Sequence, residues 1–347
     1  MAVVGHWNTL SDAQELTQSM LLKGVVRTVI ESGHLVPMMP VKQITGKDIL
    51  YNREDSWTAS DGADFAAIRQ QLSWSSDVTY TPVTVALKRI YRQDPLDNFV
   101  MDTYGNINDY RSVAIEQLTK RLVRFLEDRT VYGDLTYPLA TEEFDGLHAL
   151  AQENSGNLDI DEGEGALSLM NIRKAITAMK VNTLGKGNMI ILVPPVLGDR
   201  IDAGYAEGGL VRTGVTHAML QATIPGVGQA GQEISFFRGI PIVRSDFLVA
   251  EQANTGVGSN ARAKNSSGTE QYSIFVIRFG QTEDGGLSMG VGGGERGVDG
   301  MFRRTHFDKL EDYDSEGERL TTYMAPLLGA GSSLARIYDI TDAEVTA

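Results

Sequence analysis

The sequence of 347 residues predicts an α+β fold, with length for about two domains and a sizeable core. Hydrophobic residues make up 42% of the chain and charged residues 22%, which is typical of folded globular proteins. A long amphipathic pattern over residues 107–132 predicts a helix well above average length. Apolar runs at 189–193 and 272–279 predict strands, so the second half mixes helices and strands.

The first 34 residues predict an arm with one helix. Ser11 is a suitable N-cap for a helix over residues 12–31, and Gly33 is a plausible C-terminal stop. Pro37 and Pro40 disfavour a helix, so we expect an extended segment from Leu35 to Leu50.

A polar stretch at 51–78 precedes the alternating run 83–87, which has the period of a strand. We interpret this part as a long two-stranded excursion, and a loop of such length is normally functional or flexible. Trp57 and Trp74 place aromatic surface in it. They indicate either an interface or packing against the hairpin itself, and the sequence favours neither.

The clearest element is the helix over 107–132, whose apolar stripe includes Leu118, Leu122 and Leu126. At 1.5 Å per residue it spans about 39 Å, and Gly133 closes it. A stripe of this length needs a wide partner surface.

The second half begins with an acidic stretch at 159–164, which we expect to be a loop, and Ser168, which we expect to cap a short helix. A strand at 189–193 is followed by a helix over 196–205. Glycine-rich runs at 253–268 and 285–300 indicate surface loops. Further strands are predicted at 233–237, 240–244, 272–279 and 334–340.

Composition excludes several functions. The 45 acidic residues outnumber the 31 basic ones, and a formal charge of -14 speaks against direct nucleic-acid binding. The absence of cysteine excludes disulfides, cysteine-ligated zinc and thiol nucleophiles. The five histidines form no metal-binding pair, and residues 159–164 lack calcium-loop spacing, so we predict no metal and no cofactor. No signal peptide or membrane segment is predicted.

One sequence pattern is similar to that of a catalytic serine. Ser288 lies in Gly286–Gly290, which matches the nucleophile elbow of hydrolases, with Asp299 and His306 following in hydrolase order. A glycine run follows Ser288 where the elbow needs a helix, so a flexible loop is the favoured interpretation. The GxGxxG patterns at 226–231 and 292–297 open no helix, which favours turns over a nucleotide site.

The order of elements resembles that of tailed-bacteriophage major capsid proteins. Residues 239–246, Gly-Ile-Pro-Ile-Val-Arg-Ser-Asp, are similar to a G-x-P-V-x-x-S strand that recurs in that family, and 189–205 look like the entry to its A-domain. Residues 272–276 with 287–291 look like a late strand pair. The resemblance implies the HK97-type capsid fold, an α+β fold with an N-terminal arm, an E-loop β hairpin, a P-domain and a mixed α/β A-domain.

Carried onto this chain, the resemblance divides it into six segments. They are the N-terminal arm 1–34, the E-loop 35–97, the P-domain 98–188 with a spine helix at 106–134, the A-domain 189–305, a P-domain return strand at 306–332, and a C-terminal strand and tail at 333–347.

The resemblance implies a structural subunit, not an enzyme, that assembles as hexamers and pentamers into the icosahedral shell of a tailed dsDNA phage. Its expected partners are a separate scaffolding protein, a portal protein, an optional decoration protein, and packaged DNA bound without sequence specificity. The expected location is the virion, with assembly in the host bacterial cytoplasm and no membrane contact. On this resemblance we expect no protease-removed scaffold segment before the arm, and we predict no crosslink.

Two alternatives stay open: an encapsulin-like compartment of the same fold, and a soluble serine hydrolase using Ser288. The expected intersubunit contact on the E-loop involves Arg53, Glu54, Trp57 and Asp61. We expect charge reversal at Arg53 and Glu54 together to reduce assembly without unfolding the subunit.

Overall fold

The computed structural model describes residues 35–56, 68, 79–104, 110–135, 142–179, 188–208, 215–219, 233–253, 262–265, 269–292, 302–311 and 313–346. The arm helix predicted at 12–31, both tryptophans of the excursion and the glycine motif at 226–231 lie outside this part of the chain.

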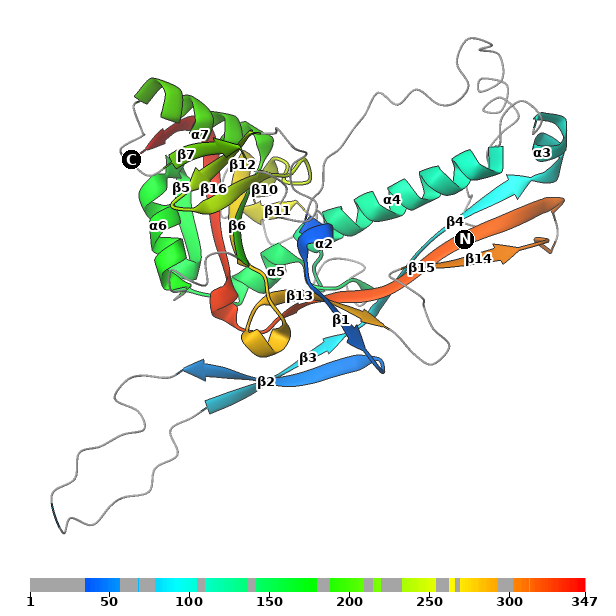
Figure 1. Cartoon of the computed structure of the whole chain (residues 1–347), viewed down its shortest axis with the longest axis horizontal. Helices are drawn as coiled ribbons and strands as arrows, with labels where there is room; N and C mark the ends of the chain where they lie inside the picture. The colour runs from blue at the N-terminus through cyan, green and yellow to red at the C-terminus, as the bar shows by residue number, and fades with distance from the viewer. Residues whose placement is uncertain are drawn as a thin grey trace.

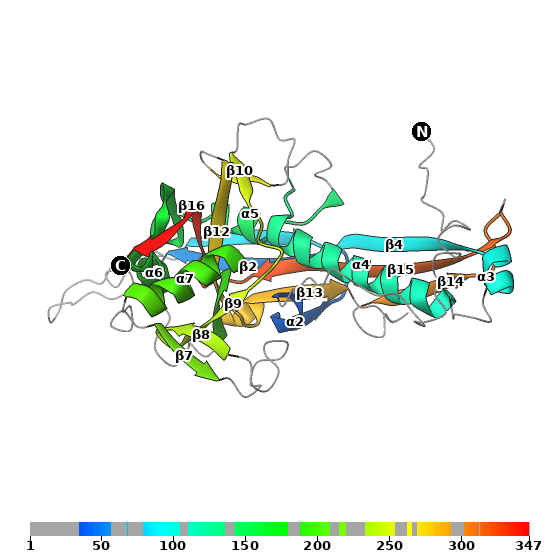
Figure 2. The same cartoon turned by 90° about the horizontal axis from the view of Figure 1, so that it is seen from above.

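The molecule is elongated, with two main sheets at its two ends (Figure 1). Helix α4, Tyr110–Tyr132, runs beside the long strands β4, Lys88–Asp97, and β15, Ser315–Leu328. Its 23 residues span about 35 Å. The helix predicted over 107–132 is therefore confirmed within the residues described, and Figure 2 shows that the long helix and the two strands share one direction.

The first sheet has five strands. Its order is β1, Val41–Ile44, then β13, Leu287–Gly292, then β15, then β14, Arg303–Phe307, with β4 also paired to β15. The apolar stripe of α4 shares one core with Ile90, Leu320 and Met324 of this sheet. The wide partner surface that the long helix requires is thus provided by the chain's own strands.

The second sheet has nine strands. The central strand β6, Met189–Val193, is buried on both faces, because its alternate side chains belong to two different cores. This explains its uninterrupted apolar run. The other strands are β5, Asp159–Ser168; β7, Val215–Met219; β8, Glu233–Phe237; β9, Ile240–Arg244; β10, Glu251–Ala253; β11, Ala263–Asn265; β12, Thr269–Arg278; and β16, Leu334–Thr346.

Helices α6, Leu169–Ala178, and α7, Pro195–Gly208, pack against this second sheet. Ile172 of α6 and Leu197 of α7 are buried in the core that includes Ile191. The strands predicted at 233–237, 240–244, 272–279 and 334–340 and the helix at 196–205 are confirmed, although β16 continues to Thr346. The short helices α3, Asn98–Tyr104, and α5, Leu147–Gln152, complete the described helices together with α2.

Three local predictions are wrong. Leu35–Met38 form the short helix α2, because Pro37 lies in a first turn where no backbone N–H partner is needed. Residues 159–164 belong to strand β5, which pairs in parallel with β16. Residues 287–292, predicted from their glycine content as part of a surface loop, form the buried strand β13, which agrees with the late strand that the capsid resemblance implies at 287–291.

A fourth detail also differs. Ser168 does stand at the N-cap of α6, but its side chain makes no cap hydrogen bond. Instead its backbone N–H donates to Glu162 at 3.3 Å.

The two sheets divide the chain differently from the six expected segments. Strands β13 and β14 fall within 189–305 or overlap its end, yet both belong to the five-stranded sheet. Strand β5 and helix α6 fall within 98–188, yet they pack with the nine-stranded sheet. The segment boundaries stay predictions, since sheet membership and domain boundaries are different properties.

A buried polar network lies where α4 and α5 meet the second sheet. Glu251 accepts a hydrogen bond from Ser273 at 2.7 Å and lies 2.9 Å from Nε2 of His148. Arg336 reaches Nδ1 of His148 at 3.4 Å and pairs with Asp159 at 2.7 Å. Burial lowers the pKa of His148 despite the neighbouring Glu251 carboxylate. A neutral imidazole can accept the hydrogen bond from Arg336 at Nδ1, which a charged imidazolium cannot do.

Candidate interaction surfaces

The predicted two-stranded excursion is confirmed as a separate hairpin. Strands β2, Asp48–Ser56, and β3, Thr79–Ala86, pair antiparallel and form their own two-stranded sheet, below the body in Figure 1. The flanking strands β1 and β4 belong to the five-stranded sheet, so within the expected E-loop of 35–97 the described hairpin proper starts at Asp48 and ends at Ala86.

Two side chains of β2 form hydrogen bonds that connect the hairpin to strand β15. The Tyr51 hydroxyl and the Arg53 guanidinium both donate to the carbonyl oxygen of Leu328, at 2.7 and 3.0 Å. Arg53 also lies 3.6 Å from the Glu153 carboxylate. Burial raises the pKa of Tyr51, so its hydroxyl remains a donor at neutral pH. The carbonyl group of Leu328, the last residue of β15, thus holds the base of the hairpin in a fixed orientation.

The expected intersubunit residues are only partly placed. Arg53 has a half-buried position, and its guanidinium already makes contacts inside the subunit. Glu54 lies one position further along β2, opposite Tyr80 of β3. Trp57 and Asp61 lie outside the described residues. An intersubunit role for the four residues stays a prediction.

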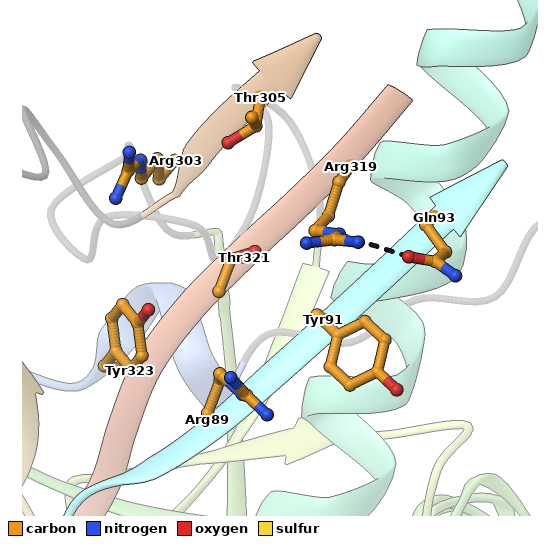
Figure 3. A pocket seen from close by; sticks show the side chains of 8 residues that line it. All are labelled: Arg89, Tyr91, Gln93, Arg303, Thr305, Arg319, Thr321 and Tyr323. Carbon is orange, nitrogen blue, oxygen red and sulfur yellow. Dashed lines mark hydrogen bonds between the residues drawn. The ribbon is translucent and has the colours of Figure 1, made fainter. Parts of the chain in front are cut away.

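A second surface lies on the first sheet, on the face turned away from α4. Strands β4, β15 and β14 place eight side chains there, in rows set by the register, around a hollow of about 450 Å³ (Figure 3). We call it the arginine–tyrosine face. Its residues are Arg89, Tyr91, Gln93, Arg303, Thr305, Arg319, Thr321 and Tyr323.

None of these eight residues is acidic, and three are arginines. Arg319 donates to Oε1 of Gln93 at 3.1 Å and stacks on Phe307, with 4.7 Å between guanidinium carbon and ring centre (Figure 3). Arg89 lies 5.8 Å from the Tyr91 ring centre. Within the part of the chain that the structure describes, neither Arg89 nor Arg303 has a carboxylate partner.

On the opposite face of the same strands, basic side chains pair with a carboxylate. Glu318 is buried there and accepts hydrogen bonds from Arg304 and Arg111 at 2.9 and 3.0 Å. His306 lies 3.0 Å from the same carboxylate. The hydrogen bonds from Arg304 are the main reason that the pKa of Glu318 falls to about 2. Arg304 and Arg111 thus pair with Glu318, whereas Arg89 and Arg303 have no carboxylate partner among the described residues.

Sequence reasoning missed the arginine–tyrosine face. The only local signal is short, an apolar residue between two residues of the face in Arg89-Ile90-Tyr91 and in Arg319-Leu320-Thr321. What the sequence does not show is that these runs pair side by side and bring their arginines to one face.

The hydrolase alternative is contradicted by the position of Ser288. Ser288 lies inside strand β13, is buried, and shares a hydrogen bond of 3.2 Å with the Thr282 hydroxyl. On β15 its partner is Leu327, whereas the partner of His306 is Glu318. Nine residues along one strand correspond to about 30 Å, so Ser288 and His306 cannot form a triad. Asp299 lies outside the described residues.

The glycines around Ser288 have packing roles. A Cβ on Gly286 would lie 2.4 Å from Cα of Gly280, and a Cβ on Gly290 would lie 2.5 Å from a methyl carbon of Ile44. Close backbone approach therefore accounts for the pattern that looks like a nucleophile elbow. Of the GxGxxG run at 292–297, the structure describes only Gly292, at the end of β13.

Within the residues that the structure describes, no group of three or more His, Asp or Glu side chains is arranged to hold a metal ion. None of the helices here is long and apolar enough to cross a membrane.

Comparison with known proteins identifies the fold through structural similarity and not through sequence similarity. The sequence matches no protein-family model and no curated protein. The structure, however, is similar over 100% of this chain and 99% of the other to the SrpI encapsulin from Synechococcus elongatus PCC 7942, with a TM-score of 0.63 and 14% identity.

Two viral-type shells are similar as well. The capsid of a native GTA particle matches 96% of this chain and 100% of its own, with a TM-score of 0.58 and 11% identity. The capsid of the cyanophage P-SCSP1u matches 94% and 93%, with a TM-score of 0.55 and 12% identity. These proteins share the HK97 fold. The chain therefore has the HK97 fold, an α+β fold of proteins that build shells, as the order of its elements predicts.

Proposed function

We propose that the protein is the major capsid protein of a tailed dsDNA bacteriophage, a subunit that assembles with copies of itself into the icosahedral head. The HK97 fold over the whole chain supports a shell-forming role. Two of the similar structures are capsids, of a GTA particle and of a cyanophage, and the order of sequence elements is that of the phage family. The proposed role is structural and not enzymatic.

The observation that carries this proposal is the projecting hairpin. An isolated two-stranded hairpin is only marginally stable in water. Leu50 and Tyr80 on this one are 66% and 61% exposed, although Tyr51 and Arg53 hold its base firmly. A fixed hairpin with exposed apolar side chains suits a contact with a neighbouring subunit.

Sedimentation velocity of the full-length protein at several concentrations, with negative-stain images of each fast fraction, tests the shell-forming role. We expect rings or closed shells, either alone or on coexpression with a scaffolding protein and a portal protein. A single small species under all these conditions would contradict the proposal.

An encapsulin-like compartment is the second candidate, because the SrpI encapsulin has a TM-score of 0.63 to this chain. Mass spectrometry of purified shells separates the two functions. A second protein enclosed at constant stoichiometry, retained after nuclease and high salt, would favour the compartment. Shells that incorporate a portal protein and fill with DNA would favour the phage head.

A further inference from the structure

We propose that the arginine–tyrosine face is a binding site for a compact polyphosphate, the class of inorganic tripolyphosphate and nucleoside triphosphates. The proposal concerns the eight residues of this face and does not depend on the shell-forming role.

The first argument is charge. The chain carries a net charge of -14, and carboxylates are available on the opposite face of the same strands, where they pair with Arg304 and Arg111. The arginine–tyrosine face nevertheless gathers three guanidinium groups around one hollow, and none of its described lining residues is acidic. A local positive site in an acidic protein attracts an anion and directs it to one place.

The second argument is hydrogen bonding. Every polar side chain lining the hollow is a guanidinium, a hydroxyl or an amide, and each of these can donate. The one amide oxygen, Oε1 of Gln93, already accepts from Arg319 (Figure 3). An extended peptide would bring backbone N–H groups that need acceptors, whereas phosphate groups bring only acceptor oxygens. The lining therefore matches phosphate better than a peptide strand.

The third argument is size and reach. A hollow of about 450 Å³ lies in the range of small-molecule sites. Arg303 and Arg319 sit on neighbouring strands one row apart, and Arg89 lies on the third strand. Three separated guanidinium groups fit a chain of linked phosphates better than one phosphate. A long nucleic acid would extend beyond the patch over a protein of net charge -14, which opposes binding.

The two tyrosines add a further property. Tyr91 is 54% exposed, and Tyr323 lies opposite Arg89 on the neighbouring strand. Exposed aromatic rings beside arginines can stack against a planar base. A nucleoside triphosphate would then bind more tightly than tripolyphosphate.

Titration calorimetry of the full-length unassembled protein at low salt tests the site with tripolyphosphate, ATP, orthophosphate and a single-stranded oligonucleotide. We expect saturable binding of tripolyphosphate, at least tenfold tighter than that of orthophosphate. The double variant Arg89→Ala/Arg303→Ala should weaken it at least tenfold. The single variant Arg89→Ala should also weaken binding, and Arg92→Ala is its matched control, because it removes one positive charge from the same strand at a position on the other face.

Far-ultraviolet circular dichroism and thermal melting establish that each variant is folded, and Arg89→Gln/Arg303→Gln replaces any alanine variant that is not. Absence of saturable tripolyphosphate binding to the wild type overturns the proposal. It is equally overturned if the double variant binds as the wild type does, if Arg92→Ala loses as much as Arg89→Ala, if orthophosphate binds as tightly, or if only the oligonucleotide binds.

Discussion

Glu127 of α4 accepts a hydrogen bond from the backbone N–H of Val36 in α2, with 3.1 Å between the two atoms. Both residues are buried, and the second oxygen of Glu127 has no hydrogen-bond partner among the described residues. Burial raises the pKa of Glu127 to about 7. This carboxyl group connects the segment that follows the predicted N-terminal arm to the C-terminal part of the long helix.

The first prediction concerns pH. The pKa of Glu127 is about 7 in the folded protein against 4.5 when exposed, so the fold favours the protonated group. The stabilising effect of protonation is complete below pH 4.5 and is lost as the pH rises through 7, with a total change of about 3 kcal/mol. Glu127→Gln should abolish this loss and be the more stable form at pH 8. The free energy of unfolding of the wild type and of Glu127→Gln is measured with a chemical denaturant at pH 5, 6, 7 and 8. If this free energy changes with pH in the same way in both proteins, the raised pKa of Glu127 is refuted.

The second prediction has the opposite sign. Because Arg304 holds the pKa of Glu318 at about 2, the charged carboxylate stabilises the fold above pH 4.5, and that contribution disappears between pH 4.5 and 2. Glu318→Gln should lower the free energy of unfolding at pH 7 by roughly 2 kcal/mol, a value reduced for solvent screening of the partly exposed arginines. Denaturant unfolding at pH 7 and 3 checks this, with Glu116→Gln on the exposed face of α4 as the control. Equal losses at both pH values would argue against it.

The third prediction concerns the base of the hairpin. Tyr51→Phe removes one hydrogen bond to the Leu328 carbonyl, and Arg53→Ala removes the other together with the contact to Glu153. Each substitution should lower the free energy of local opening of the hairpin by about 1 kcal/mol. The rate of amide hydrogen exchange in residues 48–56 should then rise, while the rate in α4 stays unchanged. If assembly requires a fixed hairpin, the double variant should also form fewer shells. Unchanged exchange in the hairpin would show that other contacts hold it.

The fourth prediction concerns Ser288. Ser288→Ala leaves the buried Thr282 hydroxyl without the partner it has now, so it should destabilise the protein by about 1–2 kcal/mol. Ester hydrolysis, measured with a small activated ester, should not differ from that of the wild type. Thr282→Val/Ser288→Ala should recover part of the lost stability. A large fall in hydrolysis with stability unchanged would restore the catalytic interpretation.

The elements with strong local patterns were predictable. The stripe through Leu118, Leu122 and Leu126 predicts α4, and the apolar run at 189–193 predicts β6, because burial requires these periods whatever the partner. The local sequence patterns gave wrong predictions for α2 and β5. Pro37 is compatible with a first helical turn, and the acidic strand β5 is stabilised by pairing with β16 and by the Arg336–Asp159 ion pair.

The candidate surfaces were less accessible to prediction. The polar composition and length of 51–78 indicated an interaction element, but no local pattern reveals that Tyr51 and Arg53 reach Leu328, 277 and 275 residues away. The arginine–tyrosine face combines residues 89–93 with 303–323, which only strand pairing brings together.

By itself, the sequence determined the α+β class, the long helix, most strands of the second half and the order of elements typical of the capsid fold. These follow from hydrophobic periodicity and from proline and glycine positions, which act over a few residues. The tertiary structure alone decided that Ser288 is buried about 30 Å from His306. It also decided that three arginines share one face whose described lining residues include no carboxylate. Strand register fixes such relationships, and register depends on the packing of distant segments against a common core.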